Sequence, residues 1–282
     1  MIPDNKENKL PKITAVCCTY GRFSFVERVV NYFLAQTYPN KEMVLYNTHE
    51  DPFSDAECKL LPRGVLIINN SVDSITKEPY TNVGAIRRDA LRFASGDYVV
   101  TWDDDDVFLP YFMQQAIDRM AETKKPFFKP DKSFFYSGDS LRLVKNTMEA
   151  SVVGSAEKVR EYGYLLDTGR EGLGWYTKAR DNKELDENDD HCIPSYCFDW
   201  ETNPTGGFIH RQSGDIDNPN NFENHKLNTT DFPAGREIRI WSTQDLITSY
   251  MPYIEYLTKN KVLFPVELFD RYVGKDFFLS SI

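Results

Sequence analysis

The first half of the chain alternates short apolar runs with stretches whose apolar residues recur at helical spacing. The apolar runs have the length and composition of strands, and they cover 13–18, 43–46, 65–68 and 98–102. The capping-box pair Ser24 and Glu27 predicts the start of a helix after the first run. Further helices are predicted from Asn82 to a stop at Gly96, and from Pro110 to about Glu122.

Strands that alternate with helices predict an α/β fold, in which helices flank a Rossmann-like, mostly parallel sheet. In such sheets, ligands bind beyond the carboxyl ends of the strands. We therefore expect the loops after Cys18, Tyr46 and Trp102 to share one rim of the sheet.

The pattern weakens after Lys124, where Asp, Asn, Pro and Gly become frequent and apolar runs are short. A last helix is predicted from Thr243 to about Thr258, and we expect it to pack back on the body as a clamp. These patterns divide the chain into a polar extension (1–11), a sheet-forming half (12–123), a loop-rich C-terminal half of the same domain (124–241) and a helical clamp (242–282).

Composition and charge narrow the class of protein. The 282 residues include 33 Lys and Arg against 43 Asp and Glu, and the resulting net charge of −10 disfavours a binder of duplex nucleic acid, which needs basic residues to displace counterions. No run reaches the roughly 20 apolar residues that span a bilayer. The five cysteines are odd in number, as is typical of reduced thiols. We expect a globular, cytoplasmic protein without a transmembrane segment.

Four consecutive aspartates, Asp103 to Asp106, follow the apolar run 98–102 directly. Crowded carboxylates repel one another unless a cation neutralises them, and Mg²⁺ or Mn²⁺ does so while binding substrate phosphates. A solvated acidic turn is the alternative interpretation. The position at the predicted sheet rim favours the metal site.

Three further segments accompany the aspartates in a fixed order: the opening strand and loop 13–22, the helix end 36–40, and the stretch 82–91 that leads into 94–106. Together the four segments resemble family 2 glycosyltransferases of the GT-A fold. The resemblance covers about residues 12–115. It implies a nucleotide-sugar donor bound by the half 12–123, with Asp103-Asp104-Asp105 as the DxD motif.

The resemblance also implies roles for individual residues. It implies nucleotide-sugar contacts from Thr19, Tyr20, Arg22, Asn82, Arg87, Arg88, Asp103 and Asp104. It implies metal ligation by Asp105 and Asp103, with His210 as a further contact, whereas a hydrogen-bonded loop histidine is the alternative for His210. Because adjacent helical residues cannot both face the ligand, Arg87 and Arg88 are alternatives, and a solvated charge stays open for each.

Two departures from the family pattern affect base recognition and catalysis. Asn47 stands where the family usually has an aspartate that reads the base; its amide can still read a uracil-like edge, and Tyr20 or Tyr46 could stack on the base. The catalytic base implied by the resemblance is Glu171, but Gly172 replaces the second acid of the usual pair. A structural carboxylate is the alternative for Glu171. Trp175, Trp200 and Trp241 could form a sugar platform, although burial in the core is the commoner role of tryptophan.

The resulting hypothesis is a metal-dependent glycosyltransferase that moves a sugar from a nucleoside diphosphate, with a UDP-sugar favoured, to a hydroxyl acceptor. If Glu171 is the base, a single displacement inverts the anomeric centre. The alternatives are a nucleotide-sugar-binding protein without catalysis and a nucleotidyltransferase, for which the loop 19–22 lacks a lysine. The acceptor stays open among a glycan, a lipid-linked glycan, a protein and a modified DNA base, and the last would suit a virus-encoded enzyme.

Overall fold

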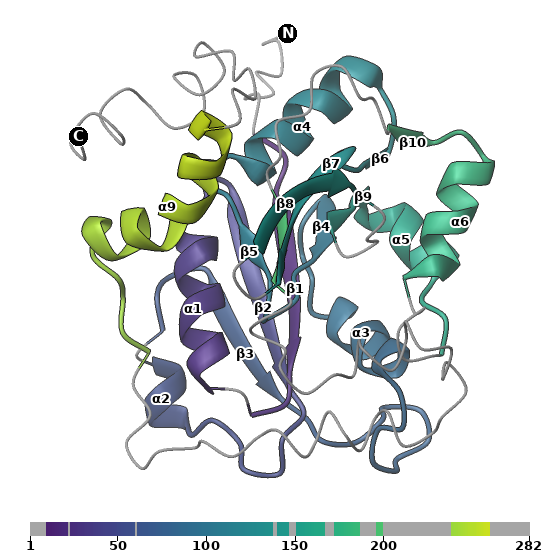
Figure 1. Ribbon diagram of the computed structural model, residues 1–282. Helices are drawn as coiled ribbons and strands as arrows, with labels where there is room; N and C mark the ends of the chain where they lie inside the picture. The colour runs from purple at the N-terminus through teal and green to yellow at the C-terminus, as the bar shows by residue number, and fades with distance from the viewer. Residues whose placement is uncertain are drawn as a thin grey trace, which may run out of the picture.

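The computed structural model describes residues 10–21, 23–59, 61–137, 140–146, 151–166, 172–186, 196–199 and 238–259 (Figure 1). Its first half contains β1 (Ile13–Thr19), α1 (Phe23–Leu34), β2 (Lys41–Asn47), α2 (Asp55–Lys59), β3 (Val65–Asn69), α3 (Val83–Leu91), β4 (Tyr98–Thr101), β5 (Val107–Phe108) and α4 (Phe112–Thr123). Its second half contains β6 (Phe127–Phe128), β7 (Lys132–Ser137), β8 (Ser140–Lys145), β9 (Val153–Ser155), α5 (Ala156–Tyr162), α6 (Leu173–Asp181), β10 (Leu185–Asp186), β11 (Tyr196–Asp199) and α9 (Thr243–Lys259).

A seven-stranded sheet in the order β10-β6-β9-β4-β1-β2-β3 forms the body of the described structure. Strand β1 pairs in parallel with both β2 and β4, and β2 pairs in parallel with β3. Only β9 runs antiparallel to its neighbours, β4 and β6. The predicted α/β fold class, a mostly parallel sheet flanked by helices, is confirmed.

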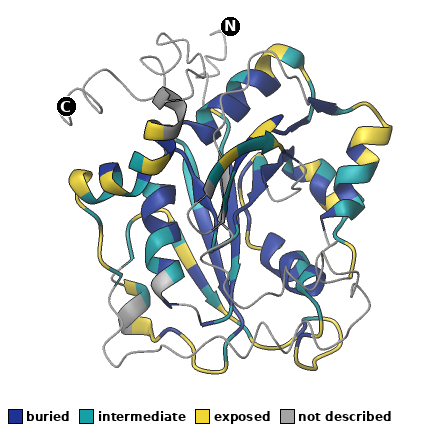
Figure 2. Ribbon diagram, in the orientation of Figure 1, coloured by how far each residue is buried: buried dark blue, intermediate teal, exposed yellow. Residues whose placement is uncertain are grey.

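Alternate residues of the central strands contribute to two cores, one on each face of the sheet. Ile13, Ala15 and Cys17 of β1 pack with α1, α4 and α9. Val16 of β1 packs on the opposite face with α3, α5 and α6. Figures 1 and 2 show this arrangement, in which the buried sides of the helices face the sheet. Burial on both faces explains why β1 reads as a continuous apolar run.

Gly96 sets the turn that delivers the chain from α3 into β4. Its backbone N–H donates a 2.9 Å hydrogen bond to the hydroxyl of Thr14. A side chain at this position would bring its Cβ within 2.7 Å of that hydroxyl and 2.8 Å of the Lys12 carbonyl. The close approach of the two strands therefore requires glycine.

The predicted loop-rich half contributes more regular structure than its sequence pattern indicated. Three of its short strands, β6, β9 and β10, complete the large sheet, and β7, β8 and β11 form a second sheet with β5. The strands β6, β9 and β10 have only two or three residues and are too short to show an alternating pattern, which explains why the sequence did not reveal these three.

The C-terminal helix α9 packs on α1, near its predicted bounds. Tyr250 is buried, lies 5.4 Å from Tyr32 between ring centroids, and donates a hydrogen bond to the Phe108 carbonyl. Trp241, just before the helix, donates from its ring nitrogen to Glu27 of α1. Among the described residues, no helix is long and apolar enough to cross a membrane.

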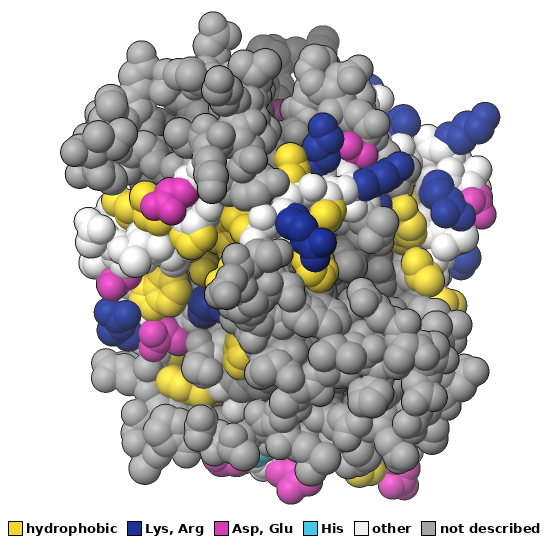
Figure 3. Space-filling model, viewed as in Figure 1, with side chains coloured by type: hydrophobic (Ala, Val, Ile, Leu, Met, Phe, Trp, Pro, Cys, Tyr) yellow, Lys and Arg dark blue, Asp and Glu magenta, His cyan; other side chains and the backbone are white. Residues whose placement is uncertain are grey.

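Lys and Arg side chains gather over β7, β8 and α6 on the face drawn in Figure 3. These elements carry the exposed residues Lys132, Arg142, Lys145, Lys178 and Arg180. The net charge of −10 is therefore an average over an uneven surface.

Candidate active site

The carboxyl ends of β1, β2 and β4 bring the predicted site residues to one rim of the sheet. Thr19, the last residue of β1, lies opposite Asn47, the last residue of β2. On the other side of β1, the backbone N–H of Trp102 donates a hydrogen bond to the Val16 carbonyl. The aspartates therefore begin directly after the last residue that is bonded to β1. This parallel register places the loop after β1 beside the acidic motif.

The four aspartates alternate between buried and more exposed positions. Asp104 and Asp106 are both 2% exposed, whereas 30% of the Asp103 side chain is exposed and Asp105 is half-buried. Asp104 accepts a 2.7 Å hydrogen bond from the hydroxyl of Thr19. The D-x-D spacing thus separates two carboxylates nearer the solvent from one that joins β4 to β1.

Arg87 of α3 reaches the acidic motif from the side. Its Nη2 donates a 2.7 Å hydrogen bond to Oδ1 of Asp103, and only 8% of its side chain is exposed. Arg88 extends elsewhere and pairs with Asp73 at 2.8 Å and with Asp89 at 3.1 Å. Of the two adjacent arginines, Arg87 is therefore the one that contacts the acidic motif 103–106.

A second arginine contact with the motif comes from α1, and no local sequence pattern indicates it. Nη2 of Arg28 donates a 2.8 Å hydrogen bond to the backbone carbonyl of Asp105. Arg28 looks like an ordinary surface residue of an amphipathic helix. Its contact depends on how α1 packs beside the motif, which local spacing does not reveal.

The amide of Asn47 is committed to neighbouring groups of the protein. Its oxygen accepts hydrogen bonds from the backbone N–H groups of Gly21 and His49, each at 3.3 Å, and its nitrogen donates to Oδ1 of Asn69 at 3.1 Å. Asn47 is fully buried. In this arrangement the side chain holds the loops after β1 and β2 together instead of presenting its amide edge to solvent.

Aromatic residues at the rim differ in their accessibility. Tyr20 is half-buried and meets the ring of His49 edge to face, with 4.8 Å between centroids. Tyr46 is buried and its hydroxyl lies 2.8 Å from that of Tyr80, so its ring faces the core. Trp175 is likewise buried.

Asn82 occupies the N-cap of α3. Its side-chain oxygen accepts a 2.8 Å hydrogen bond from the backbone N–H of Ala85, which satisfies one of the unpaired donors of the first helical turn. This cap fixes the start of the helix that carries Arg87.

The acidic motif contains the carboxylates that a hard divalent ion would need at this rim. Within the part of the chain that the structure describes, no group of three or more His, Cys, Asp or Glu side chains could hold a metal ion. Mg²⁺ needs only one or two carboxylates when substrate phosphates and water complete its shell. Asp103 and Asp105, the two half-buried carboxylates of the motif, are the candidates for such a pair. The predicted residues Arg22, Glu171 and His210 lie outside the described residues, as does Trp200.

The model of the family described as glycosyl transferase family 2 matches residues 14–150, which extend from the second residue of β1 to beyond β8 and include the whole acidic motif. Residues 14–150 belong to glycosyl transferase family 2. The chain is therefore a glycosyltransferase, as its four spaced motifs implied.

Solved structures with a similar fold include S. aureus TarS. The structure of TarS 1-349 in complex with UDP has a TM-score of 0.54 and 14% identity, covering 80% of this chain and 68% of that one. The complex with UDP-GlcNAc has a TM-score of 0.54 and 14% identity, covering 77% of this chain and 72% of that one. A further TarS structure has a TM-score of 0.53 and 14% identity, covering 77% of this chain but only 43% of that one. At this level of identity the similarity establishes the GT-A fold of the family.

Proposed function

We propose that this glycosyltransferase moves a sugar from a nucleoside diphosphate, with a divalent ion at Asp103 and Asp105, to a hydroxyl acceptor. The arrangement of Asp103, Asp105 and Arg87 carries the proposal. Asp103 and Asp105 are both half-buried at the sheet rim, and the buried Arg87 forms a 2.7 Å ion pair with Asp103. Such a site has two components: carboxylates that can bind a cation, and the fixed positive charge of Arg87. Both suit the binding of a diphosphate.

The donor is proposed to be a UDP-sugar. Its nucleotide would lie over the loops after β1 and β2, near Thr19, Tyr20, Arg22 and Asn47, and along the start of α3 at Asn82. The similar fold of TarS in complex with UDP and with UDP-GlcNAc supports this choice. Because Asn47 is committed to its neighbours, we expect it to shape the base site through the backbone of the loops it joins.

Asp103 and Asp105, with His210, are the residues we expect to hold Mn²⁺ or Mg²⁺. When bound, the ion would supply positive charge to the diphosphate as that group departs. Arg87 would add to this charge through the guanidinium that already contacts Asp103. Thr19 and Asp104 would keep the motif attached to β1 throughout.

Transfer itself is proposed to be a single displacement. The acceptor hydroxyl gives its proton to the carboxylate of Glu171, and its oxygen forms a bond to the anomeric carbon of the sugar. The bond from that carbon to the diphosphate oxygen breaks, and the electron pair leaves with the diphosphate. Attack from the face opposite the leaving group inverts the anomeric centre.

The acceptor is proposed only as a hydroxyl group, on a glycan, a lipid-linked glycan, a protein or a modified DNA base. The exposed basic residues of β7, β8 and α6 could attract an anionic acceptor, although the net charge of the protein is negative. A cytoplasmic location is part of the same proposal.

Calorimetric titration with UDP, GDP and their sugar conjugates, with and without Mn²⁺, tests the donor site. We expect one nucleotide to bind in a metal-dependent way, and Asp105→Asn to abolish that dependence. Asp181→Asn is the matched control, because this aspartate is 64% exposed on α6. A nucleotide affinity that changes neither with Mn²⁺ nor in Asp105→Asn would refute the proposed site.

Release of sugar from the donor in the absence of acceptor tests catalysis. We expect slow hydrolysis, with water in place of the acceptor hydroxyl, and its loss in Glu171→Gln with donor affinity retained. Donor binding without hydrolysis, and without transfer to any class of acceptor, would favour a binding protein that has lost catalysis.

A further inference from the structure

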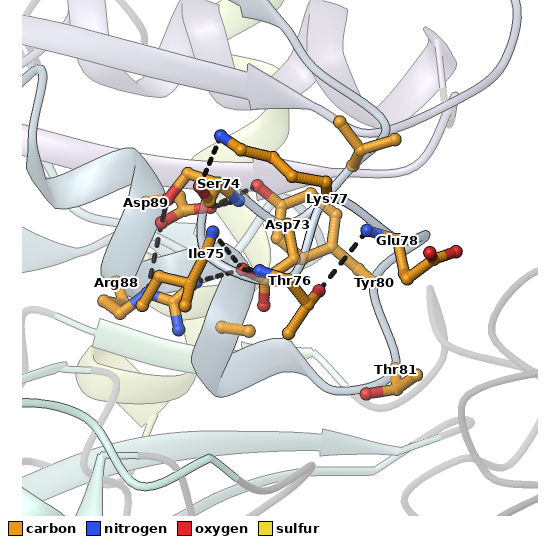
Figure 4. Close-up of polar contacts among 12 residues, drawn as sticks. Asp73, Ser74, Ile75, Thr76, Lys77, Glu78, Tyr80, Thr81, Arg88 and Asp89 are labelled. Carbon is orange, nitrogen blue, oxygen red and sulfur yellow. Dashed lines mark hydrogen bonds and ion pairs between the residues drawn. The ribbon is translucent and has the colours of Figure 1, made fainter.

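The carboxylate of Asp89 is the centre of a buried polar cluster between α3 and the loop that precedes it (Figure 4). It accepts hydrogen bonds from the backbone N–H and the hydroxyl of Ser74, at 2.8 and 2.6 Å. It also accepts one from the hydroxyl of Tyr80 at 2.7 Å and one from Nε of Arg88 at 3.1 Å. Asp89 is only 1% exposed. This one carboxylate therefore joins the loop to the helix through several donors.

A second carboxylate, that of Asp73, organises the loop itself. Its Oδ1 accepts hydrogen bonds from the backbone N–H groups of Ile75 and Thr76, at 2.7 and 3.2 Å. The same oxygen accepts a 2.8 Å hydrogen bond from Nη2 of Arg88. In Figure 4, Arg88 and Asp89 both point from α3 toward this loop. The guanidinium of Arg88 thus bridges two carboxylates, one in the loop and one in its own helix.

The cluster is also tied to the central sheet. The hydroxyl of Tyr80 lies 2.8 Å from that of Tyr46 on β2, and the amide of Asn70 donates to both hydroxyls, at 2.6 and 3.0 Å. Burial raises the pKa of Tyr80, and its hydrogen bonds to Tyr46 and Asp89 raise it further. The Tyr80 hydroxyl therefore stays protonated and donates to Asp89.

The direction of Arg87 follows from how α3 is held. Consecutive residues of a helix point about 100° apart around its axis. With Arg88 and Asp89 fixed on the loop side, the preceding residue is turned toward the rim, where Arg87 meets Asp103 at 2.7 Å. A rotation of the helix by one residue would direct Arg88 toward the aspartates instead.

We propose that Asp89, together with Tyr80 and Arg88, positions Arg87 for the donor diphosphate. This inference rests on the proposed function. It assigns Asp89 a role as a positioning residue, since its carboxylate acts through the orientation of α3. None of the three needs to touch the nucleotide sugar.

The first test measures the position of Arg87 in the ligand-free protein. The guanidinium NMR signal of Arg87 is assigned by its disappearance in Arg87→Met. In the wild type we expect the ion pair with Asp103 to slow rotation of the guanidinium and give a resolved signal. We expect this signal to broaden or shift in Asp89→Asn and, to a smaller extent, in Tyr80→Phe, which keeps the ring and removes only the hydroxyl. Glu78→Gln, on the exposed part of the same loop, is the matched control.

The second test measures coupling in donor binding. We expect Asp89→Asn to weaken metal-dependent UDP binding by about tenfold. The double variant Asp89→Asn/Arg87→Met should bind no more weakly than Arg87→Met alone, because both changes remove the same contact. Effects that multiply would show that Asp89 acts independently of Arg87 and would overturn the inference.

The two tests separate this inference from the proposed function. An Arg87 signal unchanged in Asp89→Asn overturns the positioning role, whether or not the protein binds a nucleotide sugar. A wild type with the expected signal that binds no nucleotide sugar supports the positioning of Arg87 and refutes the proposed donor site. If Asp89→Asn does not fold, Tyr80→Phe decides the outcome by the same signal.

Discussion

Thr19 and Asp104 connect two strands of the sheet through one buried hydrogen bond of 2.7 Å at the rim where the nucleotide sugar is proposed to bind. Thr19 is 5% exposed and Asp104 is 2% exposed. A charge at this depth is costly unless it is hydrogen-bonded. Asp104, the middle residue of the D-x-D motif, therefore has a structural role: it holds Asp103 and Asp105 in place at the rim.

Thr19→Val is expected to lower the free energy of unfolding by about 1–3 kcal/mol, because it removes a donor from a buried carboxylate. Urea denaturation measures the change. Thr19→Ser keeps the hydroxyl and should lose much less. Equal losses in the two variants would mean that packing of the methyl group, and not the hydrogen bond, determines the effect.

Arg87→Lys is expected to weaken metal-dependent nucleotide binding by about tenfold, because lysine keeps the charge but lacks the planar fork of donors. Calorimetry measures the affinity. Arg92→Lys changes an exposed arginine just beyond α3 and should leave the affinity unchanged. The prediction fails if the two variants bind alike.

Asn47→Asp is expected to destabilise the fold by about 1–3 kcal/mol, although the family usually has an aspartate here. The new carboxylate would face Oδ1 of Asn69, an acceptor. Asn69 cannot reverse its amide without losing hydrogen bonds to both the N–H and the carbonyl of Phe53. Urea denaturation at neutral pH gives the loss, and an unchanged midpoint would show that the amide of Asn69 does reverse.

Stability at low pH is expected to depend on Asp89. Burial alone would raise its pKa, but hydrogen bonds from Ser74, Arg88 and Tyr80 outweigh burial and lower the pKa from 3.8 to about 2. The folded protein thus binds fewer protons at this group than the unfolded chain does between pH 2 and 4. The contribution of Asp89 to stability is therefore complete above about pH 4 and is lost as the pH falls toward 2.

Denaturation of wild type and Asp89→Asn across pH 2 to 6 measures that contribution. The difference in stability between the two proteins should shrink as the pH falls through this window. A difference that stays constant would mean that Asp89 has the same pKa in the folded and unfolded states.

The strands and helices predicted from the sequence were those with strong periodicity. Buried β1 and the helix α3 have patterns that only one kind of element explains, although α3 ends at Leu91 and not at the predicted stop, Gly96. The first helix begins at Phe23, so Ser24 lies within its first turn, after Gly21 has turned the chain with a φ of 67°. Helix α2, with five residues, is too short to show a pattern.

The sequence predicted where the site lies, but not which side chains contact one another there. Parallel topology alone brings Thr19, Asn47 and the aspartates to one rim. Which of Arg87 and Arg88 meets Asp103 depends on the rotation of α3, and that rotation depends on side chains of a separate loop. The contact of Arg28 with Asp105 likewise depends on tertiary packing.

The antiparallel strand β9 has a consequence for the order in which the protein can be built. It lies between β4 and β6 in the sheet, yet it follows both of them in the chain, as well as the whole β7–β8 hairpin. Until β9 leaves the ribosome, the open edge of β4 exposes unpaired backbone groups that another chain could join. The strands β1 to β4 and the acidic motif are thus synthesised well before β9 can pair with β4. A nascent chain that pauses in this interval would be the form most prone to misassembly.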